Sequence, residues 1–135
     1  LVADYYIKRF FIPRYYTGSQ AQARTTCRAY DMDLAMIESL KEFHFACNWI
    51  VSNQEKVDHI FVHVDGMSID IPNKVDWYYT RTGKKISYKM PFTMVLPDNL
   101  NGNERCLSFH PEVCSYNDLP CDQVVPFLCE KKIIG

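Results

Sequence analysis

Two stretches in the first half of the chain carry apolar residues at the period of an amphipathic α-helix. Ser19–Gln22 and Ser39–Glu42 both have the pattern of a capping box, in which the serine hydroxyl accepts from the third backbone N–H and the Gln or Glu side chain reaches back. The apolar faces that follow are Ala23, Cys27 and Tyr30, and then Leu40, Phe43, Cys47, Ile50 and Val51. The pattern predicts two amphipathic helices between residues 19 and 51.

After about Asp58 the pattern changes to short apolar runs separated by turn residues. Strands are predicted over residues 59–64, 76–80, 104–110 and 125–130, with turns at 65–66 and 82–83. The aromatic segment YYIKRFFIP, ahead of the helices, has the composition of a further strand. Helices followed by strands are the order of an α+β domain.

The segment from about Lys84 to Asn103 has little periodicity of its own. It nevertheless carries large apolar side chains, at Tyr88, Met90, Phe92 and Met94, which a disordered segment would rarely contain. We therefore expect a long ordered loop anchored by these side chains. Its last part, VLPDNLNGNERC, is rich in side-chain oxygens, and a long polar loop of this kind is typical of a functional site.

Composition and charge exclude several classes of partner. The chain has 135 residues, of which 47% are hydrophobic and 23% charged, which predicts one globular domain over residues 1–135. A net charge of -1 gives no global attraction to nucleic acid or to an anionic membrane. No run of about 18 apolar residues is present to span a bilayer, and the first residues lack the features of a signal peptide.

The six cysteines indicate the compartment. They form an even set without a C-x-x-C pair, and four of them lie in the last part of the chain: Cys27, Cys47, Cys106, Cys114, Cys121 and Cys129. This distribution favours a disulfide framework in a secreted, extracellular protein over a metal site or reduced thiols.

Five segments together resemble, in order and spacing, the C-type lectin-like domain. They are residues 27–45, 60–67, 75–83, 95–106 and 116–130. The strongest features are a Pro-Asp loop, a Glu shortly before a cysteine, Asn-Asp-x-x-Cys, and F-x-C-E at the end. The resemblance covers about Tyr6 to Glu130 and implies two helices flanking small antiparallel sheets, a long calcium and ligand loop, and disulfide bonds. Single-domain soluble lectins of invertebrates are the type it resembles.

The resemblance also implies part of the disulfide pairing. Cys27 would join Cys129, and Cys106 would join Cys121. Cys47 and Cys114 do not belong to the family's basic pattern, so they form either a third internal bridge or bonds to a second lectin chain. The inward position of Cys47 on its helix favours the internal bridge, whereas the position of Cys114 near a turn leaves the interchain alternative open.

Calcium is the cofactor that the resemblance implies. The family's ligands fall on the tripeptide Leu96-Pro97-Asp98, on Glu104, and on Asn117 and Asp118, with a cis Pro97. Four side-chain ligands are therefore present: Asp98, Glu104, Asn117 and Asp118. Leu96 departs from the pattern because it has no oxygen where the family has a Glu or Gln that binds both calcium and sugar. The alternative is a loop whose Asp and Asn residues only make turns.

Other candidate sites have weaker support. His59 and His63 are four residues apart on a predicted strand, which is more typical of structural histidines than of a metal pair. Asp31 and Asp33 follow the first helix, where acids make turns. No G-x-S-x-G, H-E-x-x-H or P-loop motif is present, so we do not expect an enzyme.

A basic cluster offers a possible site for anionic polysaccharide, because positioned cations bind sulfate or phosphate. Its members are Arg81, Lys84, Lys85, Lys89 and Arg105. The alternative is an ordinary solvated charged turn.

Two functional hypotheses follow. The first is a secreted calcium-dependent carbohydrate-binding protein that recognises glycans or glycoproteins on microbial or host surfaces in innate immunity. The second is a lectin-like domain without sugar binding that uses the long loop to bind a protein, and the absence of an oxygen at Leu96 favours it.

Overall fold

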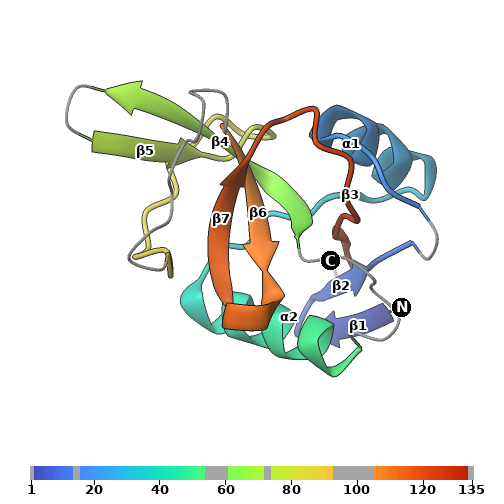
Figure 1. Ribbon diagram of the computed structural model, residues 1–135. Coiled ribbons are helices and arrows are strands. Elements are labelled where there is room, and N and C mark those ends of the chain that lie inside the picture. Colours follow the sequence, from blue (N-terminus) through green and yellow to red (C-terminus); the bar gives the residue numbers. More distant parts are fainter. Residues whose placement is uncertain (1, 14–15, 54–60, 72–73, 93–104, 134–135) are drawn as a thin grey trace.

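The computed structural model describes residues 2–13, 16–53, 61–71, 74–92 and 105–133. Two four-stranded antiparallel sheets lie beside two helices (Figure 1). The first sheet has the order β1 (Val2–Tyr5), β2 (Lys8–Phe11), β8 (Cys129–Lys132), β3 (Asp33–Leu34), and the second has the order β5 (Lys74–Tyr78), β4 (Val62–Ile71), β6 (Cys106–His110), β7 (Ser115–Leu119). The helices are α1 (Gln20–Ala29) and α2 (Leu40–Ser52), and the 3-10 turn η3 (Pro111–Val113) joins β6 to β7. The predicted α+β class is confirmed.

The first capping box is formed as the sequence predicts. The backbone N–H of Gln22 donates to the Ser19 hydroxyl, and the Ser19 N–H donates to the Gln22 side chain. Ala23 and Cys27 are buried, but the prediction for Tyr30 is wrong, because its side chain is 44% exposed. Tyr30 is the C-cap of α1, and the chain leaves the helix there through Asp31, whose φ is 60°.

The second capping box is only half formed. The Ser39 hydroxyl accepts from the Glu42 N–H at 3.1 Å, but the Glu42 carboxylate accepts instead from the Glu38 N–H at 2.7 Å. The buried face of α2 is Phe43, Ala46, Cys47 and Ile50, with Glu42 beside it. Leu40 and Val51 are 42% and 43% exposed, against expectation. Leu40 is at the first helical position, and Val51 is turned about 100° from Ile50.

Two of the predicted strand boundaries are wrong. Residues 5–13 do not form one strand, because the chain turns at Tyr6, with a φ of 52°, to pair β1 with β2. The predicted turn at 65–66 is instead the middle of β4, where the register shifts between His63 and Met67. Gly66 is needed there for a close approach, since a Cβ would lie 2.8 Å from the Leu107 side chain. A contact 41 residues away, not turn formation, therefore explains this glycine.

The remaining strand predictions agree with the structure in part. Residues 76–80 contain the last part of β5, and residues 104–110 contain the whole of β6. Of residues 125–130, only the last two belong to β8, while Val125 and Phe127 make isolated bridges to Gly18 and His63. The predicted turn at 82–83 lies where the structure has a turn ending at Gly83, whose φ is 74°.

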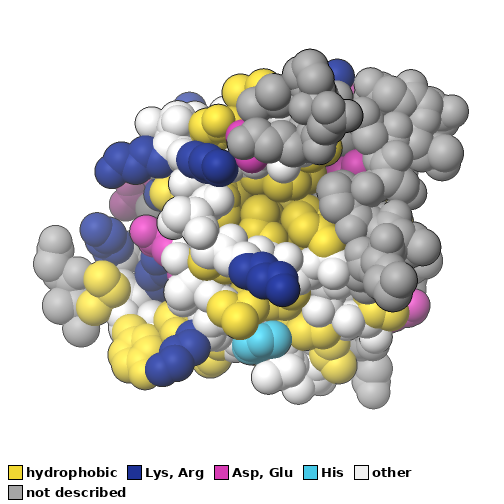
Figure 2. Space-filling view, turned by 90° about the vertical axis from the view of Figure 1, so that its left-hand side faces the viewer, with side chains coloured by type: hydrophobic (Ala, Val, Ile, Leu, Met, Phe, Trp, Pro, Cys, Tyr) yellow, Lys and Arg dark blue, Asp and Glu magenta, His cyan; other side chains and the backbone are white. Residues whose placement is uncertain are grey.

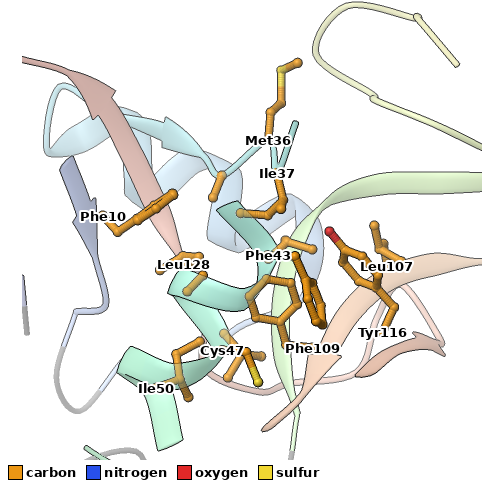
Figure 3. Close-up of a cluster of buried hydrophobic side chains, with 14 of the residues drawn as sticks. Phe10, Met36, Ile37, Phe43, Cys47, Ile50, Leu107, Phe109, Tyr116 and Leu128 are labelled. Carbon is orange, nitrogen blue, oxygen red and sulfur yellow. The ribbon is translucent and has the colours of Figure 1, made fainter. Parts of the chain in front are cut away.

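An aromatic cluster forms the centre of the larger core. Phe43 of α2 packs against Phe109 of β6 and Tyr116 of β7, with ring centroids 5.0 and 4.6 Å away (Figure 3). Phe109 and Tyr116 contact each other at 5.3 Å, and all three side chains are at most 1% exposed. Contacts at these distances and tilts are those that aromatic pairs prefer. The cluster holds α2 against the hairpin of β6 and β7.

All six cysteines form disulfides within the chain. Cys27 of α1 is bonded to Cys129 of β8, and Cys106 of β6 is bonded to Cys121 just after β7, as the resemblance implies. Cys47 of α2 is bonded to Cys114, which follows η3. No free cysteine remains, so the alternative in which Cys47 or Cys114 bonds a second lectin chain is wrong. The inward face of α2 and the turn at Cys114 meet inside one molecule.

The two ends of the described chain belong to the same sheet. β2 pairs with β1 on one side and with β8 on the other, and the Ile133 N–H donates to the Ile7 carbonyl at 2.8 Å. The N and C ends consequently lie near each other (Figure 1). The hairpin of β4 and β5 extends in another direction, away from both helices.

A buried lysine joins four segments of the chain. The Lys8 ammonium lies 2.7 Å from a carboxylate oxygen of Glu38, 2.7 Å from one of Glu42 and 3.1 Å from one of Glu130. It also donates to the Met36 carbonyl at 2.7 Å. Lys8, Glu42 and Glu130 are 6%, 3% and 5% exposed, so these charges are held almost without water.

The charge balance of this network explains its two pKa shifts. Burial alone would lower the pKa of Lys8, but Glu130, Glu38 and Glu42 outweigh it and raise that pKa. Burial raises the pKa of Glu130 by more than Lys8 and Arg81 lower it. Three carboxylates share one ammonium, so the ammonium is better compensated than any one carboxylate.

Removal of this ammonium should strongly destabilise the fold. We expect Lys8→Met to lower the free energy of unfolding by about 3–5 kcal/mol at neutral pH, because it leaves buried carboxylates without their cation. The loss should shrink as the pH falls, since Glu130, whose folded pKa is already raised, then takes up a proton. Urea unfolding at neutral and mildly acidic pH measures both effects. The control Lys131→Met, at an exposed position of β8, should change stability by less than about 0.5 kcal/mol. A pH-independent loss would contradict this account.

His63 of β4 is a buried neutral histidine. Its side chain is fully buried, and Nε2 donates to the Gln123 carbonyl at 2.8 Å. Nδ1 has no hydrogen-bond partner in the described chain, so a proton there would be a buried donor without an acceptor. Burial lowers the pKa of His63 below its ordinary value of 6.5, and the Gln123 carbonyl only partly opposes this. The structural interpretation of His63 is correct, while His59 lies outside the described residues.

His63 should make the fold sensitive to acid. As the pH falls below 6.5, the unfolded chain protonates His63 while the folded chain does not, so stability present above 6.5 is lost. This histidine contributes a slope of at most about 1.4 kcal/mol per pH unit. We expect His63→Gln, which keeps an N–H donor, to flatten the fall in unfolding free energy just below pH 6.5. His44→Gln, at an exposed position of α2, should leave the slope unchanged. Equal slopes in His63→Gln and the wild type would refute the assignment.

Candidate functional site

The described half of the predicted site lies on the hairpin of β6 and β7. Leu107 pairs with Asp118, and Ser108 pairs with Asn117. The Cys106–Cys121 disulfide closes the end of this hairpin, directly beyond the pair of Cys106 and Leu119. All five residues of β7 are buried, so the strand is covered on both faces. Asn117 and Asp118 are therefore held on a rigid element.

Asn117 presents a buried oxygen that needs a partner. Its side chain is 4% exposed, and Oδ1 accepts no hydrogen bond from the described residues. Its backbone carbonyl is already used, accepting from the Ser108 hydroxyl at 3.0 Å. An unsatisfied buried acceptor costs about 1–3 kcal/mol, so a cation, water or donor is expected at this oxygen.

Asp118 directly follows Asn117 in the chain and adds a carboxylate to β7. Asp118 is 1% exposed and takes part in other interactions, so it is a buried acid held within the fold. Amide and carboxylate oxygens are the ligands that calcium prefers. The donor set of Asn117 and Asp118 therefore fits this metal.

The other predicted ligands lie outside the described residues. Asp98 and Glu104 both belong to this part of the chain, as do Leu96 and Pro97. Within the described ranges, no three His, Cys, Asp or Glu side chains gather to hold a metal ion. The described chain resumes at Arg105, whose carbonyl accepts from the Ser68 N–H of β4 at 2.9 Å. The chain thus enters β6 at the end of the hairpin where Asn117 and Asp118 lie.

A chain of phenols connects this hairpin to the segment of residues 84–92. Tyr88 donates to the Ile37 carbonyl at 3.0 Å, and its hydroxyl oxygen accepts from the Tyr116 hydroxyl. Tyr79 donates to the same carbonyl of Ile37. Burial raises the pKa of all three phenols, so they remain neutral donors. Tyr116, directly before Asn117, is thereby fixed at both its ring and its hydroxyl.

The apolar anchors predicted for the long segment are found where they can be described. Tyr88, Met90 and Phe92 are partly buried and pack against the larger core, whereas Met94 lies outside the described residues. The Tyr116 N–H donates to the Pro91 carbonyl at 2.9 Å, and Phe92 forms an isolated β-bridge with Tyr116. The last part of this segment is thus joined to the strand that carries Asn117 and Asp118.

The predicted basic cluster does not stay together in the structure. The Arg81 guanidinium donates to the Leu34 carbonyl at 2.6 Å and lies 3.6 Å from the Glu130 carboxylate. It therefore contacts β3 and β8 of the first sheet. Arg105 is partly buried and has interactions of its own. Lys84, Lys85 and Lys89 remain as exposed cations.

Of the two acids expected to make turns, Asp33 also takes part in ion pairs. Asp31 adopts a left-handed turn conformation. Asp33 opens β3, where it lies 3.5 Å from the Arg28 guanidinium and 3.8 Å from that of Arg81. Asp31 thus has the turn role expected for it, whereas Asp33 joins β3 to Arg28 and Arg81.

Sequence reasoning missed the buried polar residues that support the site. Asp65 of β4 is fully buried and receives the Arg24 guanidinium at 2.6 Å and the Arg81 N–H at 3.2 Å. Lys8 and Glu130, which are 122 residues apart, were missed in the same way. The only local signal was a charged residue inside an apolar run, at Lys8 between aromatic residues and at Asp65 after HIFVHV.

Comparisons with known proteins identify the family. The family model described as "Lectin C-type domain" matches residues 16–131. Hemolymph lipopolysaccharide-binding protein of Periplaneta americana is 46% identical over 39 residues, which are 29% of this chain and 15% of that protein. The match thus spans only a small part of the relative's length.

Solved structures agree with the fold. The mouse scavenger receptor C-type lectin carbohydrate-recognition domain is 21% identical, with a TM-score of 0.75 over 99% of this chain and 95% of that one. A calcium-independent type II antifreeze protein is 19% identical, with a TM-score of 0.72 over 98% of this chain and 92% of that one. No described helix has the length and apolar character to cross a membrane. The chain belongs to the C-type lectin domain family, whose members are binding proteins rather than enzymes.

Proposed function

We propose that this protein is a secreted, calcium-dependent carbohydrate-binding protein that recognises glycans on microbial or host surfaces in innate immunity. The observation that carries the proposal is the buried Asn117 oxygen, which has no partner in the described chain; Asn117 directly precedes the buried Asp118 in β7. The six cysteines, all paired in disulfides, support an extracellular location. The match to a hemolymph lipopolysaccharide-binding protein supports a microbial polysaccharide as the glycan.

Four side chains would hold the metal in this proposal. Asn117 and Asp118 come from β7, and Asp98 and Glu104 come from the part of the chain outside the described residues. Bound calcium would supply open coordination positions for sugar hydroxyls. The Cys106–Cys121 disulfide and the fixed Tyr116 keep the β7 ligands in place before the metal arrives, which lowers the cost of ordering them.

Leu96 favours a second candidate function. It lacks the oxygen that the family's metal and sugar site uses, so the domain in this alternative binds a protein partner through the long loop. The similarity in fold to a protein described as a calcium-independent type II antifreeze protein supports this alternative.

Calcium should stabilise the folded protein. With a Kd of about 0.1 mM, a few millimolar calcium adds about 2 kcal/mol and raises the melting temperature by several degrees. We expect Asp118→Asn, which keeps the shape of the side chain, to abolish this shift. Asp122→Asn, at an exposed position, should retain it. Thermal melts with calcium against EDTA measure the effect. If the wild type does not respond to calcium, the protein-binding alternative takes its place.

Sugar binding should be recoverable at the position that departs from the family. We expect Leu96→Glu with Asp98→Asn, which restores the Glu-Pro-Asn tripeptide, to bind mannose in calcium more tightly than the wild type. Glycan-array binding in calcium and in EDTA measures the change. Adding Asp118→Asn should remove the gained signal. Absence of mannose binding at saturating calcium would show that the site lacks lectin geometry.

A further inference from the structure

A groove lies along β5 and the segment of residues 84–92, and neither Asn117 nor Asp118 lines it. Its volume is about 430 Å³, which is within the range of roughly 300–1,000 Å³ typical of small-molecule sites. The lining residues are Val75, Asp76, Trp77, Lys85, Ile86, Tyr88, Met90 and Phe92. Figure 2 shows hydrophobic side chains gathered in a hollow on the face that presents the hairpin of β4 and β5, with Lys and Arg side chains beside it.

The floor of the groove is apolar and firmly built. Trp77 and Ile86 are 5% and 6% exposed, and Phe92 stacks on Trp77 with ring centroids 5.7 Å apart. The Ile86 N–H donates to the Trp77 carbonyl at 2.8 Å, which fixes the two sides of the groove to each other. Val75, at 42% exposure, leaves an apolar wall in contact with solvent. An apolar lining of this kind is suited to a hydrocarbon chain rather than to a hydroxylated sugar ring.

The charges around this floor have an excess of cations. Lys85 lies 3.5 Å from the Asp76 carboxylate, so these two charges largely balance. Lys84 precedes this pair, and Lys89 lies between two lining residues; both are exposed. Neither makes an ion pair with the part of the chain that the structure describes. Lys84 and Lys89 therefore place positive charge next to lining residues in the chain, which favours an anionic group near the apolar groove.

We propose that this groove binds the acyl chain of a phosphorylated lipid, with the lipid phosphate held by Lys89 and Lys84. The apolar lining matches the hydrocarbon, and the two lysines, which make no ion pair within the described ranges, match the phosphate. Phe92 lines the groove and also forms an isolated β-bridge with Tyr116. The groove therefore ends close to Asn117 and Asp118 in the fold. One glycolipid could therefore contact both sites, yet lipid binding itself requires neither calcium nor sugar.

Trp77 provides a direct test, because one of only two tryptophans in the chain lies in the groove. A Trp49→Phe background leaves Trp77 as the single indole fluorophore. The probe is a lysophosphatidic acid with a brominated myristoyl chain, used in EDTA below the concentration at which it forms micelles. We expect saturable quenching of Trp77, because bromine on a bound chain would contact the indole. Saturable quenching in EDTA supports the lipid site even if the calcium-dependent lectin function fails.

Matched variants separate the two parts of the proposal. Val75→Gln should weaken binding about tenfold, whereas Ile69→Gln, on the opposite face of the same hairpin and 53% exposed, should not change it. Lys89→Gln should weaken binding of the phosphorylated probe about tenfold but leave binding of an uncharged brominated monoacylglycerol unchanged. Inorganic phosphate alone should not compete.

Other outcomes would overturn the proposal. Absence of quenching, or quenching that Val75→Gln leaves intact, would show that no acyl chain enters the groove. Equal binding of the charged and uncharged probes would refute the phosphate contact. Self-association of the protein that Val75→Gln abolishes, without quenching by the lipid, would assign the groove to a second copy of this chain.

Discussion

The ammonium of Lys8, buried among three carboxylates, is the interaction on which the arrangement of the first sheet depends. It joins β2 to β8, to the start of α2 and to the carbonyl of Met36. The Cys27–Cys129 disulfide places β8 where Glu130 can reach this ammonium. Separating any of these segments would leave carboxylates buried without a cation, which gives the network a strong preference for one arrangement.

The segment just before β8 connects the first sheet to the second. The His63 N–H of β4 donates to the Pro126 carbonyl at 2.9 Å, and the Leu128 N–H donates to the His63 carbonyl at 3.1 Å. β4 supports β6, which supports β7 and its two candidate ligands. The site therefore stands at the end of a continuous series of buried contacts. The two buried ends of this series, the Lys8 network and the aromatic cluster, both contact α2.

Sequence reasoning succeeded where the cause of a structure is local. The capping box at Ser19 could be read directly, because its partners are three residues apart. Gly66 was misread as a turn because the contact that explains it comes from Leu107 on another strand. The Lys8 network could not be predicted, since no local pattern shows which distant carboxylates an isolated lysine meets. For the site, only the resemblance to a family identified Asn117 and Asp118; their burial and the unpaired amide oxygen emerge from the packing around β7.

The adjacency of the two chain ends has a practical consequence. Both ends leave from the sheet of β1, β2 and β8, while Asn117 and Asp118 lie on the other sheet. A tether at either end would therefore pull on the same small region of the molecule. Immobilising the protein on a sensor chip through one end or the other should present the same binding surface to the solution. Several copies anchored in this way on one support would display Asn117 and Asp118 in a common orientation.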